Sequence, residues 1–369
     1  MTFADALLHH FDRTRRDMPW RRTSDPYAIW VSEVMLQQTR VEAVIPYWER
    51  WMARYPSVEE LAEADLDDVL RHWQGLGYYT RARNLHRAAR EVRERHAGRV
   101  PGDRDELRRL PGVGEYTAGA VASIAFGRRV PAVDGNVRRV LSRLYDLEHP
   151  RAAELRRLAD ALVPAGRPGD FNQALMELGA TLCTPRSPRC GDCPVSAWCR
   201  ARALGVQDER PRRRPPRRVP EEAVETDVVV RGDGALLLVR RPDRGLLAGL
   251  WEPPGDHRPS GVQALIEAAD PGPALEPVVH TFTHKRVTYH PRLHHAVGPG
   301  PDGLDGPDVT AWVARDRLGE YAMSVAQQKI VRAALRALGE GAGRAERRAE
   351  HTNRATAGGR GRAGPARLS

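Results

Sequence analysis

Lysine is almost absent from this chain of 369 residues, because only two of its 58 Lys and Arg residues are lysines, Lys285 and Lys329. A primary amine is the group that forms a Schiff base with a carbonyl substrate. Residues 1–284 therefore offer no lysine amine for chemistry of that kind. A basic surface in this part of the chain must be built from arginine, which binds phosphate through a planar fork of donors.

Long apolar runs are also missing. The best one, residues 116–127, has twelve residues, whereas a membrane-spanning helix needs about 20. The first residues, MTFADALLHHFDRTRR, read as an amphipathic helix and not as a secretory signal. We therefore expect no membrane association and a cytoplasmic protein.

Acidic residues are scarce in two segments that carry the whole net charge of +10. Residues 211–220 contain five arginines and no acid, and residues 341–369 contain seven arginines and two glutamates. The rest of the chain is formally neutral. Bulk charge is thus weak evidence for a polyanionic partner, and a nucleic-acid surface on the folded part must come from local arrangement.

Composition divides the chain into four parts. Residues 1–205 alternate helical periodicity with short polar breaks, which predicts an all-α domain. Residues 206–222, rich in proline and arginine, predict an extended linker. Residues 223–338 contain the strand patterns ETDVVV, ALLLVRR and HTFTHKRVTYH before the helical VAQQKIVRAALRAL, so we expect an α+β domain. The Gly/Ala/Arg-rich residues 339–369 predict a disordered tail.

All four cysteines lie within one short loop, residues 183–199, with the spacing C-x6-C-x2-C-x5-C: Cys183, Cys190, Cys193 and Cys199. Such clustering in an otherwise cysteine-free chain argues against scattered disulfides. Four thiolates on a compact loop can hold either zinc or a [4Fe–4S] cluster, and the spacing alone does not choose between them.

Residues 110–114 read LPGVG, between the helical DRDELRRL and a second helical run. Gly112 and Gly114 would allow a sharp turn and the close approach of another backbone. The amides of such a turn, with the N-terminus of the following helix, form an anion site. The pattern predicts a helix–hairpin–helix, which holds a DNA phosphate without reading bases.

Glu33 lies on a predicted helix and has four neighbours three or four positions away. Three of them, Ile29, Trp30 and Leu36, are apolar, and the fourth, Gln37, is polar. A carboxyl on such a face loses water, which raises its pKa and lets it hold a proton near neutral pH. Glu33 is therefore a candidate general acid. The alternative is an ordinary glutamate on a solvent-exposed face.

Asp134 precedes the helical VRRVLSRL, where backbone amides and the helix dipole would keep its carboxylate ionised. A simple helix cap is the alternative role. One neutral carboxyl and one charged carboxylate, however, are the usual division of labour at a glycosyl centre. The pair Glu33 and Asp134 is thus a candidate catalytic pair.

The hairpin, VDGNV at 133–137 and the cysteine spacing together resemble the endonuclease III superfamily of DNA glycosylases. Within it, SEVMLQQT (32–39), GLGYYTRARNL (75–85) and FNQALMELGA (171–180) resemble the MutY-type adenine DNA glycosylases. The resemblance covers roughly residues 1–338. It implies a multidomain protein, with an all-α helix-hairpin-helix glycosylase domain and then an α+β Nudix-like domain, and it implies that the four cysteines carry [4Fe–4S].

The resemblance also implies roles at the reaction centre. Glu33 would protonate adenine to make it a leaving group, Asp134 would stabilise the oxocarbenium-like sugar, and Asn136 would orient groups beside Asp134. Strand-cutting relatives carry a lysine at the position of Tyr116, where its amine attacks the sugar. Because a phenol cannot form an imine, we expect the reaction to stop at an abasic site.

Five further residues match DNA-contacting positions of the family. Trp20, Arg21 and Gln173 fall where the family lines its adenine pocket. Gln38 and Tyr78 match residues that insert beside the lesion while the base is extruded from the duplex. Ordinary core packing is the alternative reading of Trp20 and Tyr78.

The second domain resembles a Nudix fold, with ALLLVRR and GLLAGLWEPPG. Nudix hydrolysis needs a cluster of glutamates for magnesium, and Glu267 is the only glutamate within residues 256–274, so we expect no such activity. Phe282, Thr283 and His284 match a loop, commonly Phe-Ser-His in the family, that reads the oxidised guanine. The alternative is a plain surface β-hairpin.

We therefore expect a monofunctional adenine DNA glycosylase that acts as a monomer on double-stranded DNA containing adenine opposite 8-oxoguanine or guanine, at the nucleoid of a bacterial cell. An endonuclease III-like glycosylase and lyase for oxidised pyrimidines is the alternative enzyme, against which Tyr116 and the second domain argue. A catalytically silent DNA-binding module is a third reading, against which Glu33 and Asp134 argue.

Overall fold

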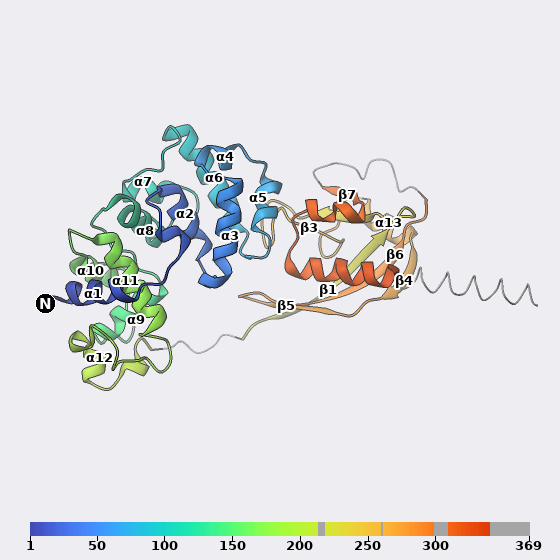
Figure 1. The fold of residues 1–369 in the computed structure, drawn as a ribbon. Helices are drawn as coiled ribbons and strands as arrows, with labels where there is room; N and C mark the ends of the chain where they lie inside the picture. Colours follow the sequence, from blue (N-terminus) through green and yellow to red (C-terminus); the bar gives the residue numbers. More distant parts are fainter. Residues whose placement is uncertain (213–217, 260, 299–308, 340–369) are drawn as a thin grey trace, which may run out of the picture. The chain divides into compact units, whose positions relative to one another are not determined.

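A computed structural model describes most of the chain: residues 1–212, 218–259, 261–298 and 309–339. The chain divides into two compact units, residues 1–217 and residues 218–369 (Figure 1). Part of the predicted linker, residues 213–217, lies outside the described residues, as does all of the predicted tail after residue 339. No described helix is long and apolar enough to cross a membrane.

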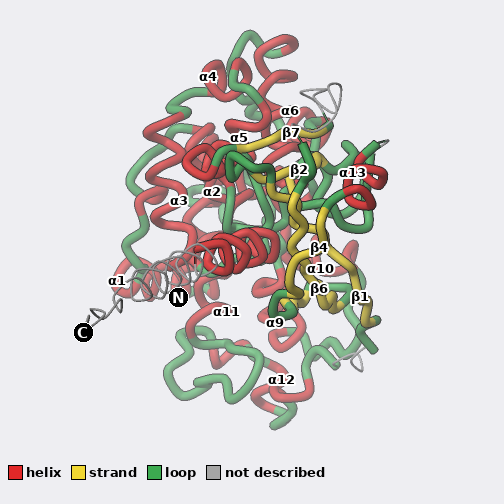
Figure 2. The backbone as a smooth tube through the Cα atoms, turned by 90° about the vertical axis from the view of Figure 1, so that its right-hand side faces the viewer, coloured by secondary structure: helices red, strands yellow, loops and turns green. Residues whose placement is uncertain are grey.

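The first unit is built from helices, as the periodicity predicted (Figure 2). Its α-helices are α1 (Phe3–Thr14), α2 (Pro26–Met35), α3 (Val41–Arg54), α4 (Val58–Glu63), α5 (Leu66–Trp73), α6 (Thr80–Arg95), α7 (Arg104–Arg109), α8 (Glu115–Phe126), α9 (Gly135–Leu144), α10 (Ala152–Leu162), α11 (Pro168–Thr181) and α12 (Arg200–Ala203). Its 3-10 helices are η1 (Pro19–Arg21), η2 (Ser196–Trp198) and η3 (Gln207–Glu209).

Helix α2 carries the predicted acid, Glu33, and is almost entirely buried. Asp25 caps it by accepting the N–H groups of Tyr27 and Ala28, and Pro26 occupies the first turn, where no N–H is needed. Nine of its ten residues are buried. It contacts α3, α6 and α8, so a polar side chain on α2 is surrounded by protein.

Helices α8, α9 and α11 pack closely and place the segment that leads to Asp134. A Cβ on Gly119 of α8 would lie 2.2 Å from the carbonyl oxygen of Pro131. From α11, the Asn172 side chain accepts the N–H of Ala132 at 3.1 Å and donates to the Val130 carbonyl at 2.9 Å. The segment before α9 is thus fixed from two sides.

The start of the predicted linker is folded onto the first unit. Arg210 is buried, and its guanidinium pairs with Asp146 at 2.6 Å and with Glu148 at 3.2 Å. Arg143 donates to the carbonyls of Gln207 and Arg210. These pairs join residues about 64 positions apart in the chain, which a reading of local composition does not detect.

The second unit contains one mixed sheet with the strand order β3-β2-β1-β6-β4; β7 pairs with β2, and β5 pairs with β6. Its strands are β1 (Glu221–Val230), β2 (Leu236–Arg240), β3 (Trp251–Glu252), β4 (Asp270–Ala274), β5 (Val278–Thr281), β6 (Arg286–His295) and β7 (Thr310–Val313). Strands β1 and β6 are parallel, and the other pairs of described strands are antiparallel. The remaining helices are α13 (Val262–Ala268), η4 (Arg315–Glu320) and the predicted C-terminal helix, residues 325–339.

Alternation along the central strands covers both faces of this sheet. Val228 and Val230 of β1 point to the face that packs against the helix at 325–339. Val229, between them, points to the other face, where it packs with α13. The α+β prediction is confirmed, although HTFTHKRVTYH forms two strands and not one, because the N–H of Phe282 bonds the carbonyl of Lys285 and closes a turn.

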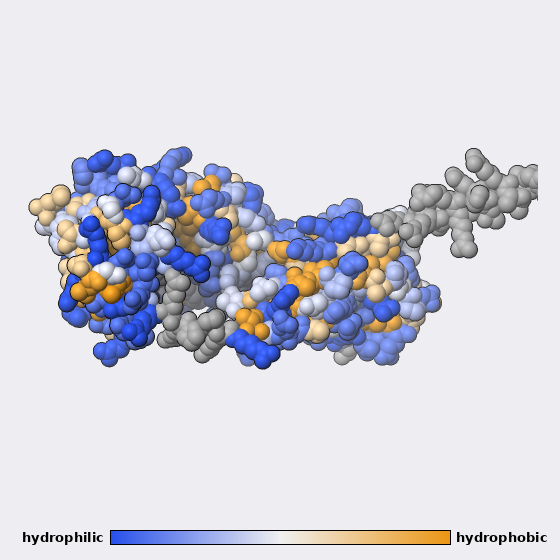
Figure 3. All heavy atoms as spheres, turned by 90° about the horizontal axis from the view of Figure 1, so that it is seen from below, coloured by the Kyte–Doolittle hydropathy of each residue, from blue (hydrophilic) through white to orange (hydrophobic). Residues whose placement is uncertain are grey.

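On the face shown in Figure 3, hydrophilic residues predominate on both units and hydrophobic residues form small separate groups. The apolar side chains are instead collected in the cores. One core joins α1, α9 and α11, and two others lie on the two faces of the sheet.

The close contact at Gly119 predicts a large effect of one methyl group. Gly119→Ala should lower the free energy of unfolding by about 1–3 kcal/mol, because the added carbon overlaps the Pro131 carbonyl oxygen and the backbone must move. Thermal unfolding of the first unit measures this. Gly166→Ala is the control, since a Cβ there meets nothing within 4 Å, and an equal loss in both variants would contradict the prediction.

Candidate active site

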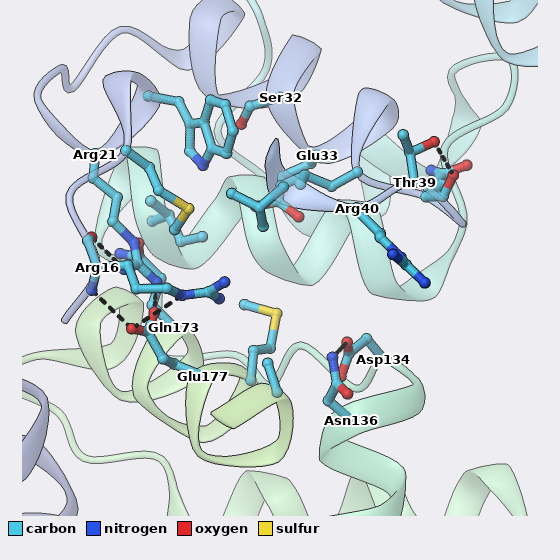
Figure 4. Close-up of a pocket in the computed structure, with 18 of the residues that line it drawn as sticks. Arg16, Arg21, Ser32, Glu33, Thr39, Arg40, Asp134, Asn136, Gln173 and Glu177 are labelled. Carbon is cyan, nitrogen blue, oxygen red and sulfur yellow. Dashed lines mark hydrogen bonds and ion pairs between the residues drawn. The ribbon is translucent and has the colours of Figure 1, made fainter. Parts of the chain in front are cut away.

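A cavity of about 740 Å³ opens in the first unit and contains most of the residues predicted to act on the substrate. Helix α2 supplies Glu33 from one side, and the start of α9 supplies Asp134 from the other (Figure 4). Helices α8 and α11 and the 3-10 helix η1 complete the walls. The sequence separates these elements by up to about 150 residues, and the fold brings them together.

Glu33 lies at the cavity wall but within the core, with only 5% of its surface exposed. The pKa of Glu33 is raised to about 7, mainly by burial and also by the nearby charge of Asp134, while the hydroxyl of Tyr116 and the charge of Arg21 oppose the rise. A carboxyl with this pKa is partly protonated at neutral pH. The expected desolvation of Glu33 is thus present in the structure.

Tyr116, in the first turn of α8, donates its hydroxyl to Glu33 Oε2 at 2.5 Å. The same hydroxyl lies 3.2 Å from the sulfur of Met176. Burial and the neighbouring carboxylates raise the pKa of Tyr116 well above its ordinary value, so the phenol stays protonated and acts as a donor. Tyr116 therefore orients the Glu33 carboxyl and favours its ionised form.

Asp134 caps α9 and accepts the N–H of Val137 at 2.7 Å and the amide of Asn136 at 3.0 Å. We expected the helix N-terminus to dominate and hold its pKa down. Burial is the larger effect and raises the pKa of Asp134, while the hydrogen bonds from Val137 and Asn136 lower it. Asp134 nevertheless accepts several donors, whereas Glu33 accepts the hydroxyl of Tyr116, so the two carboxyls do have different environments.

A charged network forms one end of the cavity (Figure 4). Arg21 pairs with Glu177 at 2.5 Å, and its Nε donates to the Gln173 side-chain oxygen at 3.0 Å. The backbone N–H of Arg16 also donates to Glu177, at 2.8 Å. Glu177 therefore holds Arg21, and Arg21 holds Gln173, in one fixed arrangement of donors and acceptors.

The remaining predicted contacts of the first unit differ in exposure. Trp20 is buried, lines the cavity and packs edge-to-face on Trp48, so the core-packing reading and the pocket reading both apply to it. Tyr78 is 46% exposed and Gln38 is exposed, which excludes core packing for these two side chains. Both line a second cavity, of about 190 Å³, next to the hairpin.

The predicted helix–hairpin–helix consists of α7, the turn at 110–114 and α8. Gly112 has φ +75°, which favours glycine, and a Cβ there would lie 2.6 Å from that of Asn84. Gly114 has ordinary backbone angles and open space, so only Gly112 is required by the turn itself. Glu115 pairs with Arg108 at 2.8 Å and thereby ties the two helices together.

The four cysteines line one small cavity of about 30 Å³, so their donor set fits a single bound group. Arg143 donates to the Cys183 sulfur at 3.2 Å. Burial raises the pKa of Cys193 to about 11, and mutual repulsion opposes four thiolates unless a cation balances them.

In the second unit, Phe282, Thr283 and His284 form the turn between β5 and β6. The Phe282 ring packs on the sheet core and on His280, with ring centres 4.5 Å apart. Thr283 and His284 are exposed at the tip. The plain β-hairpin reading is structurally correct, and both side chains are exposed to solvent in it.

Sequence reasoning missed the residues that hold others in place: Arg16, Arg139, Asn172, Met176 and Glu177. Only Glu177 carried a signal, because it lies four positions after Gln173 and so on the same face of α11. An acid one turn from a polar residue and flanked by apolar residues predicts a partner, but the partner's identity requires the fold.

Models of three known families match the chain. Residues 31–165 match the HhH-GPD superfamily base excision DNA repair protein, residues 183–199 match the iron-sulfur binding domain of endonuclease III, and residues 227–333 match the NUDIX domain. The second match includes all four cysteines. Of the two alternatives, [4Fe–4S] and zinc, this match confirms the [4Fe–4S] cofactor.

The chain is 39% identical over 401 residues to the adenine DNA glycosylase of Homo sapiens, covering 89% of this chain and 73% of that protein. It is 38% identical over 399 residues to that of Mus musculus, covering 89% and 77%. A solved thermostable thymine-DNA glycosylase is 34% identical, with a TM-score of 0.52, over 55% of this chain and 95% of that one. The similarity to the two adenine DNA glycosylases extends over both units.

The contact between Tyr116 and Glu33 predicts a change in one pKa. Tyr116→Phe removes a donor that favours the carboxylate, so the pKa of Glu33 should rise above about 7, by about one unit. Carbon-13 NMR of glutamate-labelled protein measures it, with the signal assigned by Glu33→Gln. Tyr27→Phe is the control, because Tyr27 is a buried tyrosine bonded elsewhere; an unchanged or lowered Glu33 pKa in Tyr116→Phe would contradict the prediction.

Proposed function

The chain belongs to the adenine DNA glycosylase family, and from this premise we propose that it removes adenine opposite 8-oxoguanine, or opposite guanine, and leaves an abasic site. It is a DNA glycosylase, and DNA is its partner. The observation that carries the proposal is the buried Glu33, whose pKa of about 7 lets it hold a proton at the wall of the cavity.

Glu33 acts as the general acid in this proposal. Adenine leaves the sugar poorly as an anion, and a proton from Glu33 makes it a neutral leaving group. Asp134 faces the same cavity and stabilises the positive charge that develops on the sugar until water adds to the sugar carbon and gives the abasic site. Asn136 orients Asp134 through its 3.0 Å hydrogen bond.

The reaction ends at base removal because the cavity offers no amine. Tyr116 occupies the position at which the related lyases have a lysine, and its hydroxyl is bonded to Glu33. The first unit contains no lysine in its sequence. An endonuclease III-like lyase reaction, which needs such an amine, is therefore disfavoured.

Binding of the extruded base uses the network at the end of the cavity. Arg21 and Gln173 present a donor and an amide to the edge of a base, and Trp20 supplies a flat apolar wall. Gln38 and Tyr78, which are exposed, fill the gap that the extruded base leaves in the duplex.

The turn at Gly112 and Gly114 holds a phosphate of the same DNA through backbone amides. We also propose Cys183, Cys190, Cys193 and Cys199 as the ligands of the [4Fe–4S] cluster. When bound, the cluster cross-links residues 183–199 through iron–sulfur bonds.

The second unit reads the base opposite adenine. Thr283 and His284 place a hydroxyl and an imidazole at an exposed turn, and Phe282 anchors that turn to the sheet core. Glu267 on α13 accepts a hydrogen bond from Gln263 at 2.7 Å. Because Glu267 is the only glutamate within residues 256–274, this unit lacks the glutamate cluster that magnesium-dependent Nudix hydrolysis needs.

Glu33→Gln tests the central assignment. The variant keeps the shape of the side chain but has no acidic proton, so excision of adenine opposite 8-oxoguanine should fall by about 10²–10⁴-fold while DNA binding persists. Single-turnover assays measure this, with the exposed Glu49→Gln as control.

In wild type, product strands should stay intact until alkali is added, and borohydride should trap little protein.

Near-normal excision by Glu33→Gln would show that another residue is the acid. Efficient borohydride trapping by the wild type would instead overturn the assignment of a monofunctional enzyme, whatever the result for Glu33.

Thr283→Ala combined with His284→Ala tests the role of the second unit. Loss of hydrogen bonds of this kind costs about 1–3 kcal/mol, so the preference for 8-oxoguanine over guanine should shrink by about ten- to a hundredfold. The ratio of the two excision rates at matched salt removes general changes in DNA affinity. Val297→Ala, at another exposed position of the unit, is the control; an unchanged ratio in the double variant would refute the role.

A further inference from the structure

Gln38 and Tyr78 share an unusual backbone conformation. Gln38 has φ 56° and Tyr78 has φ 50°, in the left-handed region that side chains other than glycine rarely adopt. The two residues lie 40 positions apart, one just after α2 and the other just before α6. Backbone of this kind persists only where the surroundings enforce it, so a common element should hold both loops.

Arg81, in the first turn of α6, is that element. It is buried, with 9% of its surface exposed, and its guanidinium lies between the two loops. Its Nη1 contacts the carbonyls of Val34 (2.9 Å) and Met35 (2.8 Å) at the end of α2 and that of Gln37 (2.6 Å) in the loop that follows. Its Nη2 donates to Thr39 Oγ1 (3.2 Å) and to the second-loop carbonyls of Leu76 (3.2 Å) and Gly77 (3.1 Å).

The charge of Arg81 is balanced by carbonyl dipoles. Burial lowers the pKa of Arg81 to about 10, and no carboxylate of the described residues is near enough to oppose this. The carbonyls of Val34 and Met35 belong to the last turn of α2, where carbonyl groups lack helical partners and the helix dipole is negative. Arg81 therefore caps the C-terminus of the helix that carries Glu33.

Arg81 also contacts the exposed tyrosine itself. Its guanidinium lies 5.5 Å from the centre of the Tyr78 ring and 5.2 Å from that of Trp73. The cavity of about 190 Å³ beside it is lined by Gln38, Tyr78 and Gly112, so both loops face the predicted phosphate-binding turn.

We propose that Arg81 is a positioning residue for base extrusion, which holds Gln38 and Tyr78 as one rigid pair. The inference rests on the proposed function, in which these two side chains enter the duplex. If the two side chains are already ordered before DNA binds, the conformational entropy of ordering them is not lost during extrusion. The free-energy barrier to extrusion is lower for that reason. Arg81 then acts on opening of the duplex and not on cleavage of the glycosidic bond.

Two substrates separate these steps in the full-length, cluster-containing protein. In the first duplex adenine is opposite 8-oxoguanine and fully stacked. In the second it is opposite a tetrahydrofuran abasic analogue, so that extrusion is easier. Arg81→Met should lose about ten- to a hundredfold in single-turnover rate on the first and no more than about threefold on the second, each relative to wild type.

Arg81→Lys distinguishes geometry from charge. A lysine ammonium keeps the charge but cannot span two loops as a planar fork does, so the rate should recover only in part. Thr39→Val removes one acceptor and leaves Arg81 in place, so it should also lose more rate on the 8-oxoguanine duplex than on the tetrahydrofuran duplex, with a smaller loss than Arg81→Met. This variant tests the inference if Arg81→Met does not fold. Arg90→Met, at an exposed position of α6, should match wild type on both duplexes.

Equal losses on the two substrates, or no loss, in Arg81→Lys and Thr39→Val would overturn the inference while leaving adenine excision by the wild type intact. Failure of the wild type to release adenine from either duplex would instead remove the proposed function on which the inference rests.

Discussion

Removal of water from the Glu33 carboxyl is the constraint that shapes the first unit. The unfolded chain releases this proton near the ordinary pKa of 4.5, and the native state holds it up to about 7. Because one unit corresponds to about 1.4 kcal/mol, the folded protein is about 3 kcal/mol less stable above pH 7 than it would be with an unperturbed glutamate. Stability from this group is therefore lost as the pH rises from 4.5 to 7.

The surroundings of α2 are arranged to tolerate that carboxyl without hydrating it. Asp25 caps the first turn, and Trp48 donates its indole N–H to the carbonyl of Ala28 at 3.0 Å. Tyr116 donates a short hydrogen bond to the acid, and Asp134 faces it from the start of a separate helix. A fixed helix thus carries a side chain that is dry, oriented and still open to the cavity.

Local patterns in the sequence predicted much of this. The spacing of apolar residues around Glu33 indicated burial, the LPGVG turn indicated the hairpin, and the clustered cysteines indicated a metal centre that only the family resemblance identified as [4Fe–4S]. The sequence could not show pairs that depend on packing, such as Arg21 with Glu177 or Tyr116 with Glu33, which lies 83 positions away. The pKa of Asp134 was misjudged for the same reason, because its burial comes from neighbours distant in the chain.

The acceptors around Arg81 have a consequence for how the molecule can change. Five of the six are backbone carbonyls, which every amino acid possesses, and Thr39 alone contributes a side chain. Side chains in the two loops can therefore be exchanged, by evolution or by directed libraries, without dismantling their support. The side chains that the two loops present to DNA can therefore vary while the backbone contacts to Arg81 stay the same.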